Sequence, residues 1–251
     1  MSKAILFIGH GSRSADAITE TYSLVEQCRS AIPIDVQEVG FLEISTPTIK
    51  AAFETCVAKG ATEIIVVPLL LMEAGHAKID IPEQLSACFT DNYENITIKY
   101  AKPFGIHDLM VTIVEDKVRS LGIVENVDRL ILIGRGSSDP HLSKNFNKLI
   151  SLIEKKELAN KVEVCYLYGT EPSFKDVQWE IEKSNETVIF LPYLLFTGLL
   201  YEGIQRNLDN TDKRIYRTNY LFPHPNIIKI ISLRVAEAKE ITIAEKIKWL
   251  H

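Results

Sequence analysis

Cysteine is scarce in this sequence, and its cysteines do not form any paired motif. They lie at Cys28, Cys56, Cys88 and Cys165, with no C-x-x-C pair among them. This spacing excludes the cysteine motifs of iron–sulfur proteins. A chain of 251 residues can bury enough apolar surface to fold without disulfides. We therefore expect reduced, mostly buried thiols in a cytoplasmic protein.

Long hydrophobic runs and runs of positive charge are also missing. The most apolar stretch, Ile64–Met72, contains Pro68 and is far shorter than the about 20 residues that span a bilayer. The run at Ala4–Ile8 is too short for a secretory signal. The net charge is −5, and no Lys/Arg cluster offsets it. These absences predict a soluble protein with neither a membrane nor a nucleic-acid partner.

Several sequence motifs of well-known enzyme classes are absent as well. The sequence has no G-x-x-x-x-G-K-[ST] loop, no G-x-G-x-x-G fingerprint and no H-E-x-x-H pair. It also has no G-x-S-x-G elbow. These absences leave the sequence without the motifs of P-loop nucleotide hydrolases, dinucleotide-binding enzymes, zinc proteases and α/β-hydrolases.

What the sequence does contain is an internal repeat. Ala4–Arg13 (AILFIGHGSR) matches Arg129–Ser138 (RLILIGRGSS), Val39–Leu42 matches Val164–Leu167, and Glu63–Met72 (EIIVVPLLLM) matches Thr187–Phe196 (TVIFLPYLLF). The offset is 125 residues for the first two pairs and 124 for the third. Three matches in one order at nearly one offset indicate two tandem copies of one unit, residues 1–122 and 123–251.

Each copy alternates apolar runs with helical patterns. In the first copy we expect strands at 4–8, 36–42, 63–71 and 96–101, and helices at 15–30, from Pro47 with Thr46 as its cap, and at about 106–121. Such alternation predicts an open parallel sheet with helices on both faces. The predicted fold is therefore α/β, with two tandem pseudo-symmetric lobes of flavodoxin-like or Rossmann-like type and a cleft between them.

Three polar side chains follow successive strands of the first copy. His10 follows the first strand, Glu43 the second and His76 the third. Because ligands of open parallel sheets bind beyond the carboxyl ends of the strands, we expect these groups to lie at one edge. Two imidazoles and a carboxylate form a mixed nitrogen and oxygen site that suits iron(II), cobalt(II), nickel(II) or zinc(II).

The second copy lacks all three side chains. Arg135 stands where the first copy has His10, and Tyr168 and Leu200 stand against Glu43 and His76. A purely structural role would give little reason for the copies to differ at all three places. The comparison therefore predicts that the chemistry lies in the N-terminal copy.

Other polar residues near the predicted strand ends have two readings. The hydroxyls of Ser12, Ser137 and Ser138 could hold an anion, although capping of a helix is their simpler use. Arg13 and Arg135 could bind substrate carboxylates or form surface ion pairs. The remaining histidines, His107, His141, His224 and His251, are assigned to loops or termini.

The histidine motifs resemble those of a known family. Gly9–Arg13 (GHGSR), a later strand that ends in P-x-x-L, and Gly75–Pro82 (GHAKIDIP) look like the class II chelatases of tetrapyrrole biosynthesis. The two-copy format is similar to the long form of that family. The resemblance implies two chelatase lobes with a tetrapyrrole cleft, metal-binding and catalytic roles for His10 and His76, and Glu43 as their acidic companion.

The resemblance also implies a reaction, the insertion of Fe²⁺ into sirohydrochlorin without ATP. Cobalt insertion stays open, as do a metal- or tetrapyrrole-binding protein without turnover and an unrelated α/β enzyme. We expect no cofactor beyond the substrate metal. Because the substrate carries many carboxylates, Arg13, Lys78, Arg135 and Arg206 are the candidate cations. The repeat predicts a monomer, since two lobes can satisfy each other.

Overall fold

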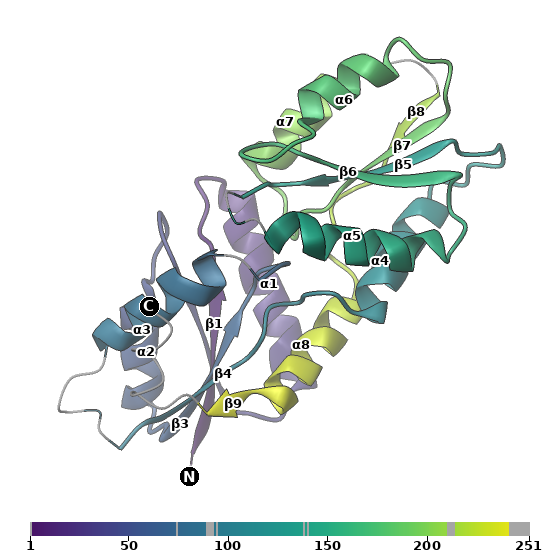
Figure 1. The fold of residues 1–251 in the computed structure, drawn as a ribbon. Helices are drawn as coiled ribbons and strands as arrows, with labels where there is room; N and C mark the ends of the chain where they lie inside the picture. The colour runs from purple at the N-terminus through teal and green to yellow at the C-terminus, as the bar shows by residue number, and fades with distance from the viewer. Residues whose placement is uncertain are drawn as a thin grey trace. The chain divides into compact units, whose positions relative to one another are not determined.

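The computed structural model describes residues 2–73, 75–88, 93, 95–137, 139, 141–209 and 214–240. The chain forms two compact units, residues 1–105 with 228–251 and residues 106–227. Each unit contains a sheet of four parallel strands (Figure 1). This arrangement confirms the predicted α/β class with one parallel sheet in each of two similar lobes.

The first unit contains the sheet β2-β1-β3-β4, which β9 extends in antiparallel pairing. Its elements are β1 (Lys3–Gly9), α1 (Ala15–Ala31), β2 (Val36–Phe41), α2 (Ile49–Ala58), β3 (Glu63–Pro68), a π-helical turn (His76–Asp80), α3 (Ile81–Cys88), β4 (Thr97–Tyr100), most of α8 (Pro225–Glu237) and β9 (Lys239–Glu240). Helices α2 and α3 cover one face of the sheet, and α1 and α8 cover the other (Figure 1).

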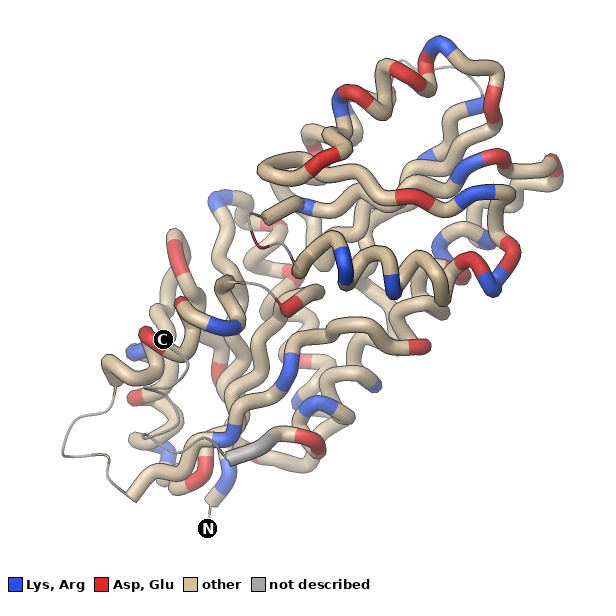
Figure 2. Tube along the Cα trace, in the orientation of Figure 1, with Lys and Arg blue, Asp and Glu red and all other residues tan. Residues whose placement is uncertain are grey.

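The second unit repeats this order with the sheet β6-β5-β7-β8. Its elements are α4 (Asp108–Arg119), β5 (Arg129–Gly134), α5 (His141–Glu154), β6 (Lys161–Tyr166), α6 (Phe174–Ile181), β7 (Val188–Pro192), α7 (Leu199–Leu208) and β8 (Ile215–Arg217). Acidic and basic residues are interspersed in both units (Figure 2). Among the described residues, no helix has the length and apolar character needed to cross a membrane.

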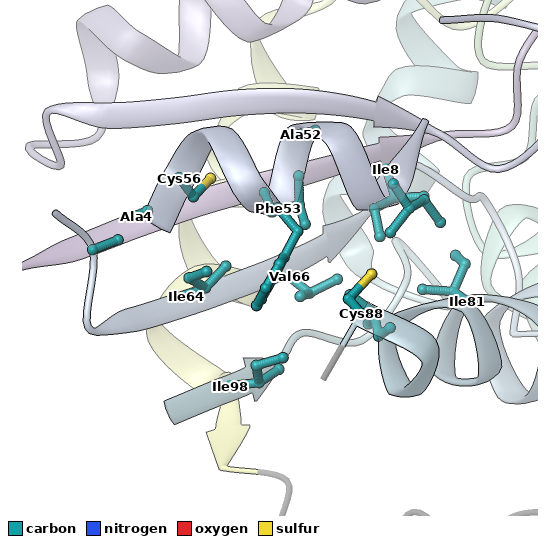
Figure 3. Packing of buried hydrophobic residues seen from close by; sticks show 14 of the residues in the cluster. Ala4, Ile8, Ala52, Phe53, Cys56, Ile64, Val66, Ile81, Cys88 and Ile98 are labelled. Atoms are coloured by element: carbon teal, nitrogen blue, oxygen red, sulfur yellow. The ribbon is translucent and has the colours of Figure 1, made fainter. Parts of the chain in front are cut away.

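Strand β1, which lies between β2 and β3 in the first unit, is buried on both faces. Ala4, Leu6 and Ile8 pack in a cluster with Phe53 of α2 and residues of α3 (Figure 3), and at most 1% of each of these strand side chains is exposed. Parallel strands under two helix layers have this uniform apolar pattern. Burial of one such side chain contributes about 1.5–3 kcal/mol, so the core holds the carboxyl end of β1 in a fixed position.

The start of α2 differs from the prediction. The helix begins at Ile49, and Thr48 is its N-cap, with the hydroxyl accepting a hydrogen bond from the Ala51 N–H. Pro47 lies before the helix, after a cis peptide bond. Its carbonyl accepts a hydrogen bond from the Phe41 N–H, which keeps Pro47 beside the end of β2 rather than in the helix.

The compact units have other limits than the two sequence copies, since packing divides the chain between residues 105 and 106 and between 227 and 228. Helix α4 belongs to the second unit, where it contacts α5 and β7. Most of α8 belongs to the first unit, and Arg234 of this helix donates hydrogen bonds to the carbonyls of Pro103 and Phe104. The last helix of each repeat thus packs with the other copy's sheet.

The repeat extends to individual hydrogen bonds. In the first unit the Glu43 N–H donates to the His10 carbonyl at 3.2 Å, and in the second the Tyr168 N–H donates to the Arg135 carbonyl at 3.0 Å. The Ser45 hydroxyl donates to the carbonyl of Ser12 and accepts from its N–H. Thr170 makes the same two bonds with Ser137. The two copies therefore share the loop scaffold and differ in the side chains placed on it.

Candidate metal site at the edge of the first sheet

His10 occupies the first residue beyond β1, between two glycines. A Cβ on Gly11 would lie 1.8 Å from the carbonyl oxygen of Glu43, and Gly11 has a φ of +97°. Only glycine combines this backbone conformation with so close an approach. The loops after β1 and β2 therefore lie directly against each other, which brings His10 and Glu43 together.

The side chains of His10 and Glu43 face each other. The Nε2 atom of His10 lies 3.2 Å from Oε1 of Glu43, and 27% and 49% of the two side chains are exposed. The pair is thus reachable from solvent while the strand beneath it is fully buried. A carboxylate this close can share a proton with the imidazole. The two groups can also bind one metal ion together.

His76 begins the π-helical turn between β3 and α3. The Ile81 N–H donates a hydrogen bond to the His76 carbonyl, five residues earlier, and this i to i+5 hydrogen bond is typical of a π-helix. π-Helical turns are rare in proteins overall, and those that occur are often found at functional sites. The phenol of Tyr100 on β4 donates to the Ala77 carbonyl at 2.9 Å and so fixes the turn to the sheet. Burial first, and then the charge of Glu73, raises the pKa of Tyr100, which keeps this phenol protonated.

Asp80 is a member of the site that the sequence reasoning missed. Its Oδ2 lies 2.5 Å from Nδ1 of His76, four residues earlier in the chain. A carboxylate only accepts hydrogen bonds, so the neutral imidazole carries its proton on Nδ1 and presents Nε2 as a ligand. The signal that could have found Asp80 is its spacing of four residues from His76 on a helical segment.

The structure brings the three predicted ligands into one cluster. One nitrogen of each histidine and one carboxylate oxygen of Glu43 all lie within 4.8 Å of one another. The ring centroids of His10 and His76 are 4.8 Å apart. Because nitrogen and oxygen ligands sit about 2.0–2.2 Å from a divalent ion, small side-chain movements would let all three bind one metal.

The other predicted site residues of the first unit lie close in sequence to this cluster. Ser12 belongs to the loop scaffold, since its hydroxyl accepts a hydrogen bond from the Ser14 N–H. Arg13 is exposed on the same loop, and Lys78 is half-buried on the π-turn.

The remaining predicted site residues belong to the second unit. Arg135 is exposed after β5, and the Ser137 hydroxyl accepts a hydrogen bond from the Asp139 N–H. Arg206 on α7 lies 3.7 Å from a carboxylate oxygen of Glu202. Ser138 lies outside the described residues, as does His251.

Comparison with known proteins gives a family match over both copies. The model of the CbiX family matches residues 4–121 and again residues 129–238. Sirohydrochlorin ferrochelatase of Bacillus subtilis (strain 168) is 39% identical, over 94% of this chain and 92% of that protein. Sirohydrochlorin cobaltochelatase of Priestia megaterium is 29% identical, over 95% of this chain and 80% of that protein.

Solved structures agree with these relatives. The fold matches SirB from Bacillus subtilis with Fe³⁺ at a TM-score of 0.85 and 38% identity, with 94% of this chain and 95% of that chain covered. It also matches a sirohydrochlorin chelatase SirB from Bacillus subtilis subspecies spizizenii in complex with cobalt, at a TM-score of 0.81 and 36% identity over 94% of this chain and 95% of that chain.

Two parallel α/β units, one of which carries two histidines and a carboxylate at its sheet edge, define a protein of the metal-chelatase class. Such an enzyme is a lyase. The chain belongs to the CbiX family, which confirms the family that the histidine motifs predicted.

Proposed function

We propose that this protein inserts Fe²⁺ into sirohydrochlorin without ATP. The observation that carries the proposal is the cluster of His10, Glu43 and His76, whose ligand atoms lie within 4.8 Å of one another at the carboxyl ends of parallel strands. The sirohydrochlorin ferrochelatase of Bacillus subtilis (strain 168), at 39% identity, supports iron as the metal. We treat the metal as a substrate and propose no resident cofactor.

The three ligands suit a metal that must be released again. Sites with three protein ligands leave coordination positions open, whereas structural sites close all of them. The ring nitrogens of the tetrapyrrole can then replace the protein ligands one after another. The exposed fractions of His10 and Glu43 leave the open side of the site accessible to a large planar substrate.

The ring must lose two N–H protons as the metal enters, and the site holds groups that can accept them. A histidine cannot bind the metal and accept a proton with the same nitrogen. Because His76 uses Nδ1 toward Asp80, its Nε2 is the atom left for the metal. We therefore propose that all three side chains first bind the metal and that His76 keeps it longest. His10 and Glu43, which lie 3.2 Å apart, then accept the protons once the ring nitrogens have replaced them on the metal.

Cations of the chain are proposed to bind the carboxylates at the edge of the ring. Arg13 and Lys78 lie on the two loops that carry the histidines. Arg135, with Ser137 and Ser138, follows the corresponding strand of the second copy. Arginine suits this role because its planar guanidinium can bind a carboxylate through two hydrogen bonds.

The test is anaerobic incubation of the purified protein with sirohydrochlorin and Fe(II), without ATP, followed by absorbance. We expect insertion well above the uncatalysed rate, and loss of this acceleration in His10→Ala and His76→Ala. Parallel reactions with Co(II) measure metal preference. A strict need for ATP, or no acceleration with either metal, would contradict the proposal and leave a binding protein.

We also propose that the protein is a cytoplasmic monomer. Four free and buried cysteines support a reducing compartment. Burial raises the pKa of Cys28 and Cys165 to about 12, so these thiols are unreactive in the folded protein. The presence of two copies in one chain supports the monomer. Sedimentation equilibrium checks it, and a mass near twice 28.3 kDa would contradict it.

A further inference from the structure

Ile44 directly follows the ligand Glu43, and both its side chain and its backbone are unusual. The side chain is 62% exposed, and φ is +67°. This left-handed conformation is rare for a residue branched at Cβ, because the side chain crowds the backbone. The Ser45 N–H donates to the Glu43 carbonyl at 2.6 Å, so Ile44 is the central residue of a γ-turn of the strained kind.

The surrounding loops hold this turn in place. The Ser45 hydroxyl bonds to the backbone of Ser12, and the Glu43 N–H bonds to the His10 carbonyl. These bonds place the Glu43 carboxylate beside His10. The position of Glu43 therefore requires a positive φ at residue 44. It does not require that residue 44 be isoleucine.

The second copy shows what the turn alone needs. The residue at the position of Ile44 is Gly169, which has a φ of +64°. Glycine adopts this conformation at almost no cost. The first copy instead has a strained residue whose side chain gains little from packing, since most of it is exposed. Strain of this kind persists mainly where it serves a function.

The other ligand-bearing segment of the unit has a similar feature. Ile79 lies on the π-turn that begins with His76, and 45% of it is exposed. At the offset of 124 residues the second copy has Gly203 in its place. Both segments thus present an exposed isoleucine in the copy with the metal ligands, and glycine in the copy without them.

We propose that Ile44 and Ile79 form an apolar contact surface for the face of the tetrapyrrole ring. This inference rests on the proposed function. A metal bound by His10, Glu43 and His76 reaches the ring nitrogens only if the ring lies against the ligands, so residues beside the ligands touch the ring. The ring face is apolar and flat while its carboxylates lie at the edge. Contact removes the isoleucine side chains from water and holds the ring over the metal.

Titration of the metal-free protein with sirohydrochlorin, followed by absorbance, tests the proposal without turnover. The variants are Ile44→Gly, Ile44→Asn, which tolerates positive φ with a polar side chain, and Ile44→Leu, which keeps an apolar one. We expect the first two to weaken binding about tenfold and Ile44→Leu to bind within twofold of the wild type. Ile44→Gly is also expected to raise the unfolding temperature, because it relieves the strained turn.

Glu157→Gly is the matched control. Glu157 also has a positive φ, +52°, and it lies in the second unit. Its replacement should raise the unfolding temperature in the same way and leave sirohydrochlorin binding unchanged. A loss of ring binding in this control would show that the effect of Ile44→Gly is general.

Co(II) titration of the same variants separates ring contact from metal binding. We expect Ile44→Gly to bind Co(II) like the wild type. Ring binding by Ile44→Gly within twofold of the wild type would overturn the proposal, and so would an equal loss of Co(II) affinity, which would assign Ile44 to the metal site's shape. Wild-type protein that binds the ring but inserts no metal would contradict the proposed function alone.

Discussion

Replacement of Asp80 by Asn tests how His76 is prepared for the metal. Nδ1 of His76 lies 2.5 Å from Oδ2 of Asp80. A carboxylate that accepts the Nδ1 proton fixes the ring orientation and leaves Nε2 as the ligand atom. Asparagine keeps the size of the side chain and removes its charge. Groups that orient a metal-binding histidine in this way typically account for about 10–100-fold in metal affinity or activity.

The structure places the expected effect at the low end of that range. A hydrogen bond to a charged group contributes about 1.5–3 kcal/mol. Here 35% of the His76 side chain and 45% of the Asp80 side chain are exposed, so solvent screens the interaction. An expected loss of about 1–1.5 kcal/mol corresponds to an affinity that is about five- to thirteenfold weaker. Calorimetric titration with Co(II) measures it directly.

The matched control is Asp116→Asn. Asp116 lies 3.0 Å from Nε2 of His224 in the second unit, so this variant removes the charge from another histidine–aspartate pair. It should bind Co(II) like the wild type. Equal affinity of Asp80→Asn and the wild type, or an equal loss in both variants, would refute the argument that Asp80 acts on the metal through His76.

Two further predictions concern the scaffold. Gly11→Ala and Gly136→Ala each put a Cβ within 1.8 Å of a carbonyl oxygen, at a residue with positive φ. Each variant should therefore lower the free energy of unfolding by more than about 1 kcal/mol. Only Gly11→Ala should also abolish Co(II) binding. Urea titration and calorimetry check this pair, and similar metal affinities would contradict it. The hydrogen bond from Lys99, opposed by partial burial, lowers the pKa of Glu63. A lowered carboxyl pKa stabilises the fold above the unfolded value of about 4.3, and this stability is lost as pH falls through the folded pKa. Glu63→Gln should therefore flatten the fall in the urea midpoint between about pH 5 and pH 3, and an unchanged slope would exclude this role.

The fold could be predicted from the sequence because buried parallel strands have a simple pattern. Ala4–Ile8 is apolar at every position, and the structure buries every one of these residues. The repeat added independent support, since three of the four predicted strands of the first copy match a segment of the second. Local pattern and long-range repeat agree, which is what a well-specified fold requires.

The structure differs from the sequence-based expectations at places where tertiary contacts determine the conformation. Pro47 has the local features of a first helical residue, but its carbonyl bonds to Phe41 on β2, and the helix starts at Ile49. Packing likewise assigns α4, the last helix of the first copy, to the second unit, and most of α8, the last helix of the second copy, to the first unit. Contacts between distant residues leave no periodic signal in the sequence.

The cluster of candidate metal ligands could be predicted because the strand order brings its three residues to one sheet edge. His10, Glu43 and His76 follow three strands that are neighbours in the sheet, so their meeting depends only on strand order. Asp80 and Tyr100 could not be found this way. Asp80 meets His76 in the π-turn, and Tyr100 reaches that turn from β4, so the contact of Tyr100 depends on the tertiary fold.

The shared scaffold leads to a last prediction, that a metal site can be built in the second copy. Tyr168 and Arg135 make the backbone hydrogen bond that Glu43 and His10 make, with lengths of 3.0 and 3.2 Å. The double variant Arg135→His with Tyr168→Glu should therefore place an imidazole beside a carboxylate as in the first copy. A pair of ligands binds first-row metals weakly, so we expect a second, weaker Co(II) site.

Addition of Leu200→His should strengthen that second site less than His76 strengthens the first. Leu200 lies in an α-helix, α7, whereas His76 lies in a π-turn with Asp80 as its partner, and the residue at the position of Asp80 is Ile204. Calorimetry that finds one Co(II) per chain in every variant would contradict the equivalence of the two loop scaffolds. Two sites of equal affinity would contradict the importance of the π-turn. Two unequal sites would show that the first copy's chemistry depends on both its side chains and the turn that presents His76.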